Sequence, residues 1–304
     1  MVYENVYFTS YHVCHILRGG NIMEILPLAS DSLGVRSMAT FIQTEDVRIT
    51  VDPSAALGPK RYRLPPTQKE LTMLKRVKKI INSYALKSDI LTISHYHYDH
   101  YDPNETFYND KKVFAKNIKD HINKSQQKRG SDFQKKVQNN CELTYADNKS
   151  YSFGSTSLSF SPPFFHGPEN VRLGYVIMTT VQDNSKTVVH ASDVQGPVTK
   201  EATNYIIKQH PDLLIMDGPP TLFLGWRFST QNLNDASENL IRIIQKTNCE
   251  VILDHHLLRD LKYKTRFSTP YEKFDEKIST FAEYLGKENN MLEAHRKMIW
   301  EKEH

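Results

Sequence analysis

The chain places three histidines and an aspartate in one short segment, His95-Tyr96-His97-Tyr98-Asp99-His100, directly after the apolar run Ile90-Leu91-Thr92-Ile93. An apolar, partly β-branched run of this length predicts a buried strand. Imidazole and carboxylate groups crowded at the end of such a strand are costly unless a cation ties them together. Zinc takes both neutral imidazole nitrogen and carboxylate oxygen. The segment therefore predicts a metal site.

The spacing within this segment predicts two ions rather than one. Side chains two positions apart in an extended segment point the same way, so His95 and His97 can reach one ion. Asp99 and His100 come where the chain is expected to turn into a helix, and they can face a second ion. Two-metal hydrolytic sites hold their ions about 3.5–4 Å apart. A structural role is the alternative for any single histidine at a strand end, but the crowding favours a metal.

Composition is that of an ordinary globular protein. Of the 304 residues, 39% are hydrophobic and 24% are charged, and the net charge of +4 argues neither for nor against nucleic acid. No run of about 18 or more apolar residues exists, so we expect no membrane span. Cys14, Cys141 and Cys249 lie far apart and form no metal-binding spacing. We interpret them as reduced intracellular thiols and expect a cytoplasmic protein without a disulfide scaffold.

The first 22 residues are expected to be an extension outside the domain. They are aromatic and irregular, and they lack the pattern of a signal peptide. A strand-like run begins at Met23, and Arg18-Gly19-Gly20 just before it could be encoded by a purine-rich ribosome-binding sequence read in frame. Our hypothesis is that Met23 is the native start. No linker-like shift in composition follows, so residues 23–304 are predicted to form one domain.

Hydrophobic periodicity predicts strands in the first quarter and the middle of the chain, with helices between them. The expected strands cover residues 23–28, 36–42, 47–51, 90–93, 113–115, 155–161, 171–180, 187–190, 213–216 and 251–253. The expected helices cover residues 67–86, 118–137 with a break near Gly130, 230–247 and 270–286. This order indicates a layered α/β arrangement with sheets inside and helices outside.

Three further candidate ligands each follow an apolar run. His166 follows Phe164-Phe165, Asp193 follows the run near residues 187–190, and Asp254-His255-His256 follows the run at 251–253. Strand ends are the usual place for functional groups on such scaffolds. Each residue has a structural alternative when taken alone, since Asp193 could cap a helix beginning near Val198. Together they supply the ligands that two ions would still need.

In this order and spacing, the residues resemble the five motifs of the metallo-β-lactamase-fold hydrolases. The matching elements cover residues 23–260: Asp52 after a strand, His95/His97/Asp99/His100, His166, Asp193 and His255. Residues 28–40, 94–100 and 254–260 resemble more narrowly a small, largely archaeal branch of that superfamily. The resemblance implies an α/β fold, a four-layer αββα sandwich, with a dinuclear site at one edge of its two sheets.

The resemblance also implies a role for each residue. His95, His97 and His166 would hold the first zinc, and Asp99, His100 and His255 the second. Asp193 would bridge both ions, and Asp52 would support the ligands through hydrogen bonds without touching the metal. His256 is the alternative to His255. Flavodiiron proteins of this fold have a glutamate at the position of His97. The histidine here favours zinc over iron, although ligand chemistry alone leaves iron or manganese open.

The implied activity is hydrolysis by a metal-activated hydroxide, with Asp99 orienting the nucleophile or shuttling its proton. A phosphodiester or phosphate-bearing small molecule is slightly preferred because a basic stretch could steer anions, although a solvated helix face is the commoner explanation of such a stretch. That stretch comprises Lys111, Lys112, Lys116, Lys119, Lys124, Lys128, Arg129, Lys135 and Lys136. A thioesterase or lactonase and a non-catalytic, metal-stabilised interaction protein are the alternatives. Long nucleic acid is not favoured, and the oligomeric state is left open.

Overall fold

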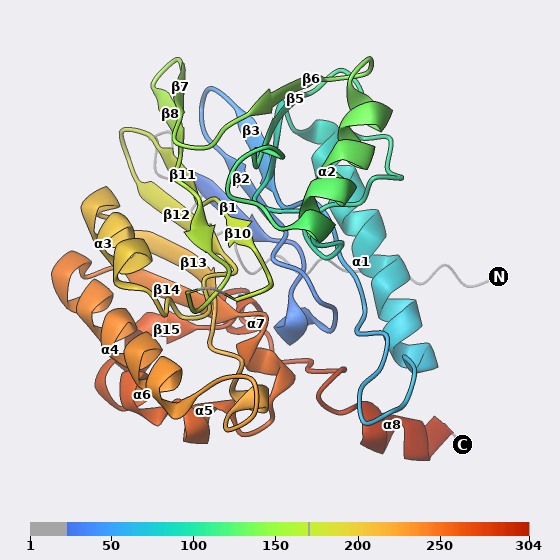
Figure 1. The fold of residues 1–304 in the computed structure, drawn as a ribbon, viewed down its shortest axis with the longest axis vertical. Coiled ribbons are helices and arrows are strands. Elements are labelled where there is room, and N and C mark those ends of the chain that lie inside the picture. Colours follow the sequence, from blue (N-terminus) through green and yellow to red (C-terminus); the bar gives the residue numbers. More distant parts are fainter. Residues whose placement is uncertain (1–22, 170, 304) are drawn as a thin grey trace.

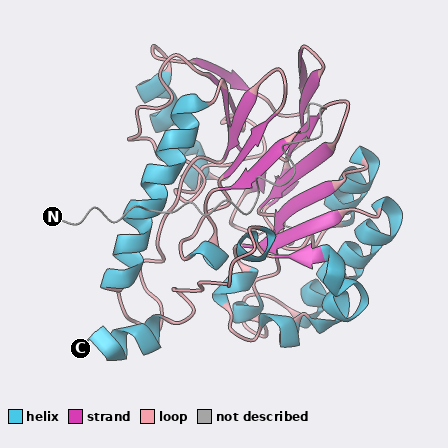
Figure 2. Cartoon of the chain, turned by 180° about the vertical axis from the view of Figure 1, so that it is seen from behind, coloured by secondary structure: helices cyan, strands magenta, loops and turns pink. Residues whose placement is uncertain are grey.

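The computed structural model describes residues 23–169 and 171–303, so the predicted extension at residues 1–22 lies outside the described residues. Two β-sheets pack face to face, and helices cover the outer face of each sheet (Figures 1 and 2). Within the described ranges, no helix is both long enough and apolar enough to span a membrane.

The first sheet has six strands in the order of the sequence. They are β1 (Glu24–Pro27), β2 (Thr40–Gln43), β3 (Arg48–Val51), β4 (Ile90–Ile93), β5 (Lys112–Ala115) and β6 (Glu142–Tyr145). The first three strands pair antiparallel, whereas β3 to β6 pair parallel. Parallel neighbours need a crossover, which α1 (Gln68–Lys87) provides between β3 and β4, and α2 (Lys124–Val137) between β5 and β6.

The second sheet has seven strands in the order β15-β14-β13-β12-β11-β8-β7. They are β7 (Ser150–Phe153), β8 (Thr156–Phe160), β11 (Thr179–Gln182), β12 (Thr187–Ser192), β13 (Leu213–Asp217), β14 (Glu250–Asp254) and β15 (Ile278–Ser279). The strands from β12 to β15 run parallel, with α3 (Lys200–Gln209) and α4 (Thr230–Thr247) as crossovers. A separate ribbon pairs β9 (Phe164–Phe165) with β10 (Tyr175–Val176).

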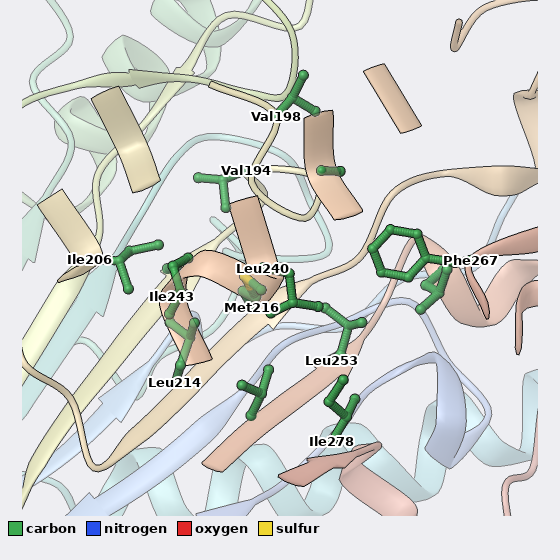
Figure 3. Packing of buried hydrophobic residues seen from close by; sticks show 14 of the residues in the cluster. Val194, Val198, Ile206, Leu214, Met216, Leu240, Ile243, Leu253, Phe267 and Ile278 are labelled. Carbon is green, nitrogen blue, oxygen red and sulfur yellow. The ribbon is translucent and has the colours of Figure 1, made fainter. Parts of the chain in front are cut away.

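Successive side chains of each strand face opposite sides of the sheet, so the core forms in layers. In β13, Leu213 and Ile215 face the first sheet and pack with residues such as Ile49, whereas Leu214 and Met216 face the helices. Figure 3 shows Ile206 of α3 and Leu240 and Ile243 of α4 beside Leu214, Met216 and Leu253.

On the far side of the first sheet, Leu91 and Ile93 of β4 pack against Phe133 of α2. Val77 and Ile81 of α1 pack against Phe41 of β2. The layer order is therefore helix, sheet, sheet, helix, and the predicted four-layer αββα sandwich is confirmed.

Three expectations about helices are wrong. After His100 the chain turns but no helix begins, because Pro103 disfavours helical backbone at the residue before it. Helix α2 begins at Lys124 and runs through Gly130 without a break, since that glycine packs closely on Tyr96.

The expected terminal helix over residues 270–286 is divided, because strand β15 interrupts it to pair with β14. The segment contains α5 (Tyr263–Arg266), α6 (Ser268–Phe274), β15 and α7 (Phe281–Tyr284), and α8 (Arg296–Glu303) follows.

Candidate metal centre

The candidate ligands meet where strands of both sheets end. Asp52 follows β3 and the segment from His95 to His100 follows β4, while Asp193 follows β12 and His255 follows β14. Strands β3 and β4 pair parallel, and β12 to β14 do so in the second sheet, so their carboxyl ends share one edge of the sandwich. His166 comes from the end of β9.

Left-handed backbone marks three of these strand ends. Asp52, Ser192 and His255 have φ angles of 49°, 55° and 55°, a region that non-glycine residues enter at a cost. Asp52 and His255 adopt this conformation themselves, and Ser192 adopts it directly before Asp193. Such backbone persists only where the surroundings hold it, which is typical of functional sites.

The first donor group contains His95, His97, His166 and Asp193. One ligand atom from each lies within 4.8 Å of all the others. His95 Nε2 is 3.0 Å from His97 Nδ1, and His166 Nε2 is 3.0 Å from Asp193 Oδ2. Zinc bonds of about 2.0–2.2 Å place ligand atoms at similar separations around a tetrahedron, so this group fits one ion.

The second donor group contains Asp99, His100 and His255, whose ligand atoms also lie within 4.8 Å of one another. His255 Nε2 is 3.6 Å from Asp99 Oδ2. Both histidines are fully buried, whereas the Asp99 side chain is 17% exposed. Asp99 is thus the member of this group that faces solvent.

Asp193 lies between the two groups. Its Oδ2 atom is 3.0 Å from His166 Nε2 and 3.6 Å from His95 Nε2, both in the first group. The same atom is 3.2 Å from His100 Nε2 and 3.7 Å from His255 Nε2, both in the second. One carboxylate oxygen therefore adjoins imidazole nitrogens of both groups, which is the position a bridging ligand needs.

Asp52 supports the candidate ligands through hydrogen bonds and belongs to neither donor group. Its carboxylate accepts hydrogen bonds from Ser94 N at 2.8 Å, Ser94 Oγ at 2.6 Å and His100 Nδ1 at 2.8 Å. Because Ser94 Oγ donates to Asp52, it accepts from His95 Nδ1 at 3.0 Å. Both imidazoles thus present Nε2 to the site, and Asp52 fixes their orientation.

Asp31 is a supporting residue that was not predicted from the sequence. It lies in the short helix η2 (Asp31–Leu33), and its Oδ2 accepts a hydrogen bond from His255 Nδ1 at 2.8 Å. Its Oδ1 accepts from Arg259 Nε at 3.1 Å. The only sequence signal was its place in the stretch from residue 28 to 40 on which the family resemblance rests.

His256 has a different partner. Its Nδ1 lies 2.6 Å from Asp217 Oδ2 at the end of β13, and Asp217 was also not identified from sequence. His256 forms a third group with Asp193 and His255, but it adjoins neither Asp99 nor His100 in the second group. The geometry thus brings His255, rather than His256, into that group.

The ionisation of the site suits a cation. Burial lowers the pKa of His97 to about 3 and that of His95 well below its ordinary value, so both imidazoles are neutral donors. Burial raises the pKa of Asp99, but the imidazoles of His100 and His255 outweigh this effect and lower it. Burial likewise lowers the pKa of His100, but the carboxylates of Asp193 and Asp52 raise it above the ordinary value. An ion at His100 Nε2 would therefore release a proton.

Buried polar atoms without hydrogen-bond partners give an independent test of whether the donor groups suit metal ions. Within the part of the chain that the structure describes, four buried atoms in the two donor groups make no hydrogen bond: His100 Nε2, both ring nitrogens of His166, and Asp193 Oδ1. Buried polar atoms normally have partners. The atoms without partners are imidazole nitrogens and a carboxylate oxygen, which are the ligand atoms that zinc and similar divalent ions bind. The residues therefore fit the expected metals.

The structure thus brings together every residue predicted to bind metal: His95, His97, Asp99, His100, His166, Asp193 and His255. It places Asp52 behind them. The alternative that Asp193 caps a helix is wrong, because Thr199 caps α3 through a hydrogen bond from Ala202 N. His/Asp clusters with this set of donors are suited to binding divalent metal ions.

Comparison with known proteins identifies the family. No family model matches the chain. It is 44% identical over 290 residues to a UPF0282 protein of Methanocaldococcus jannaschii, covering 91% of this chain and 96% of that protein. It is 43% identical to a UPF0282 protein of Methanopyrus kandleri, covering 90% of this chain and 98% of that protein.

Among solved structures, unliganded yeast PDE1 superposes with a TM-score of 0.51 at 13% identity, covering 86% of this chain and 98% of that one. This likeness concerns the fold alone. The identity over nearly the full length of the archaeal relatives is much higher, and it shows that the chain belongs to the UPF0282 family.

Proposed function

We propose that the protein is a dinuclear metal-dependent hydrolase with zinc in both donor groups. The position of Asp193 carries this proposal, because its Oδ2 lies within 3.7 Å of imidazole nitrogens from both groups. A single structural ion would need only one group. Two complete donor sets that share one carboxylate match the arrangement of two-metal hydrolytic sites.

Two bound divalent ions would supply a Lewis acid and lower the pKa of a coordinated water to about 7. The protein's own contribution is orientation. Asp99 is charged and 17% exposed, whereas the Asp193 side chain is 2% exposed. In this proposal the Asp99 carboxylate orients the attacking water by accepting a hydrogen bond from it. Asp52 and Asp31 keep the imidazoles of His100 and His255 in place.

We further propose a phosphate-bearing small molecule or short phosphodiester as substrate. Part of the basic stretch has other partners, because Lys116 is buried against Asp147 and Lys112 pairs with Glu142. Arg129 of α2, in contrast, lies at the segment that carries the ligands. Its Nη1 donates to the Tyr96 carbonyl at 3.2 Å, and its guanidinium lies 4.7 Å from the Tyr98 ring centre. A cation beside the ligands favours an anionic substrate.

The test combines metal analysis with a substrate screen on one preparation. Purified protein is analysed for metal by mass spectrometry, then assayed with bis(p-nitrophenyl) phosphate, an aryl thioester and a simple lactone. We expect about two zinc ions per chain and turnover of the phosphodiester. His97→Ala and Asp193→Ala should lose both metal and turnover, because each removes a ligand from the first group.

The matched control is Asp89→Asn, which removes a carboxylate that pairs with Arg48 on the surface, away from the donor groups. It should keep metal and turnover. Turnover of the thioester or lactone alone would replace the phosphate proposal with the thioesterase or lactonase alternative. One buried ion without turnover of any probe would indicate a metal-stabilised interaction protein and contradict the proposed hydrolase.

A further inference from the structure

A buried guanidinium lies beside the second donor group. Arg259 ends the short helix η4 (Leu257–Arg259) that follows β14, and it is 7% exposed. Its Nη2 lies 3.1 Å from His255 Nε2 and 3.7 Å from Asp99 Oδ2. A permanent positive charge therefore adjoins two of the residues that would hold the second ion, at the atoms they would use for it.

This guanidinium makes one hydrogen bond to a carboxylate, and its Nη2 contacts the His255 ring at 3.3 Å from Nδ1 and 3.1 Å from Nε2. Nε donates to Asp31 Oδ1 at 3.1 Å, while the other oxygen of Asp31 is taken by His255 Nδ1 at 2.8 Å. Across residues 23–169 and 171–303, Nη1 of Arg259 makes no hydrogen bond. Asp31 thus fixes the direction of the side chain, and Nη2 lies beside the second donor group.

Two further arginines, buried Arg296 and half-buried Arg36, are arranged differently. Arg296 donates through both Nε and Nη2 to Glu70, at distances of 2.7–3.1 Å. Arg36 donates through both Nε and Nη2 to Glu293, at 2.7 and 2.6 Å. A carboxylate matches the two-pronged edge of a guanidinium in each of these structural pairs. Arg259 lacks such a pairing because its Nη2 turns away from Asp31 toward the metal ligands.

We propose that Arg259 is a substrate-binding residue that holds the anionic oxygens of a phosphoryl group beside the second donor group. The inference rests on the proposed function and specifies its substrate class. A guanidinium is always charged, presents donors in a fixed fork and is more weakly hydrated than an ammonium, which suits phosphate oxygens at a buried position. The uncharged carbonyl of a thioester or lactone offers far less to a permanent cation.

The test measures phosphate binding without turnover. Zinc-loaded protein is titrated with inorganic phosphate near neutral pH by calorimetry, and its metal content is measured in the same sample. Arg259→Met keeps much of the apolar stem and removes the charge. Loss of a charge-assisted hydrogen bond should weaken phosphate binding about 10- to 100-fold, with the metal content unchanged. The control is Arg48→Met, which makes the same charge change at the start of β3, where Arg48 pairs with exposed Asp89.

Equal phosphate affinity in Arg259→Met and the wild type would overturn the inference, even if the protein hydrolyses a phosphodiester. Loss of zinc from Arg259→Met would also overturn it, since Arg259 would then serve to position Asp31 and His255. If that variant aggregates, Arg259→Lys decides instead. The inference requires weaker phosphate binding by the lysine variant at full metal content, because an ammonium cannot reproduce the fork. Binding without any turnover would contradict the proposed function while leaving the inference standing.

Discussion

Asp52 and His100 lie 48 positions apart in the sequence, yet the Asp52 carboxylate accepts a hydrogen bond from His100 Nδ1 at 2.8 Å. Both side chains are fully buried. The same carboxylate accepts two hydrogen bonds from Ser94, which in turn contacts His95. Asp52 thus orients one imidazole of each donor group, and the strand ends β3 and β4 are tied together at the candidate metal centre.

Asp52→Asn should weaken metal binding without removing a ligand. An amide keeps the size of the side chain but loses the charge that orients His100 and, through Ser94, His95. Replacing a group of this kind typically lowers metal affinity about 10- to 100-fold. Competition with a zinc chelator measures the change. Asp89→Asn, a surface substitution, is the control, and an unchanged zinc affinity in Asp52→Asn would show that Asp52 has only a folding role.

His255→Ala and His256→Ala should differ in metal content. His255 Nε2 adjoins both Asp99 and Asp193, whereas His256 uses its Nδ1 on Asp217. We therefore expect His255→Ala to fall from about two zinc ions per chain to about one, and His256→Ala to keep both. Metal analysis after gel filtration gives the answer. The opposite pattern would assign the ligand role to His256.

The sequence could predict the ligands because each is a polar residue placed directly after an apolar run, which is a local signal. Asp31 carries no such signal. It contacts His255 across 224 positions, and nothing near Asp31 in the sequence indicates that pairing. Arg259 was missed for the same reason, since its role depends on contacts between loops that only the folded chain creates. Asp217 does follow an apolar run, at residues 213–216, so the same local signal could have found it.

The expected helix over residues 270–286 shows a second limit of predicting structure from hydrophobic periodicity. Its apolar residues are compatible with helical spacing, but Ile278 and Ser279 pair with β14 as strand β15. Phe281 N then donates to Asp254 Oδ2 at 2.9 Å, at the end of β14. Pairing with the sheet edge outweighs local helix preference here, and periodicity alone cannot show where an edge strand is needed.

Arg296→Met should strongly destabilise the fold. Arg296 and Glu70 are both fully buried and join helix α8 to the start of α1, where Glu70 also completes the capping box with Thr67. Removing the guanidinium leaves a buried carboxylate without its cation, which costs about 3–5 kcal/mol. Denaturant unfolding measures the loss. Arg48→Met breaks an exposed pair and should cost about 0.2–1 kcal/mol. Similar losses in the two variants would mean that burial of the Arg296 pair contributes nothing.

Stability should fall in acid through Glu293. Burial raises the pKa of Glu293, but its hydrogen bonds and charge interaction with Arg36 lower it from 4.5 to about 2. Because the pKa is depressed in the folded state, this carboxylate stabilises the fold fully above pH 4.5, and the contribution is lost as pH falls through about 2. A shift of this size corresponds to about 3 kcal/mol as an upper value.

The unfolding free energies of the wild type and Glu293→Gln should therefore differ most near neutral pH and converge in acid. Denaturant titrations over that range measure the difference. Glu142→Gln is the control, because it removes an exposed carboxylate whose pair with Lys112 lies on the surface. A difference between the wild type and Glu293→Gln that stays constant with pH would show that the ion pair with Arg36 does not cause it.

Gly130→Ala should destabilise the protein although alanine favours helices. A Cβ at this position of α2 would lie 2.5 Å from Ile118 Cγ2 and 2.8 Å from the Tyr96 ring. Overpacking of this kind costs about 1–3 kcal/mol, more than the roughly 1 kcal/mol that helix propensity returns. Tyr96 stands between His95 and His97, so movement of its ring should also lower zinc affinity.

The melting temperature and a chelator titration test both parts of this prediction. Ser131→Ala is the control at the next position of the same helix, and it should leave both quantities nearly unchanged because a serine hydroxyl is small and alanine suits a helix. Higher stability in Gly130→Ala would show that α2 can move away from Tyr96. Lower stability with normal zinc affinity would show that the ring of Tyr96 is not coupled to the positions of His95 and His97.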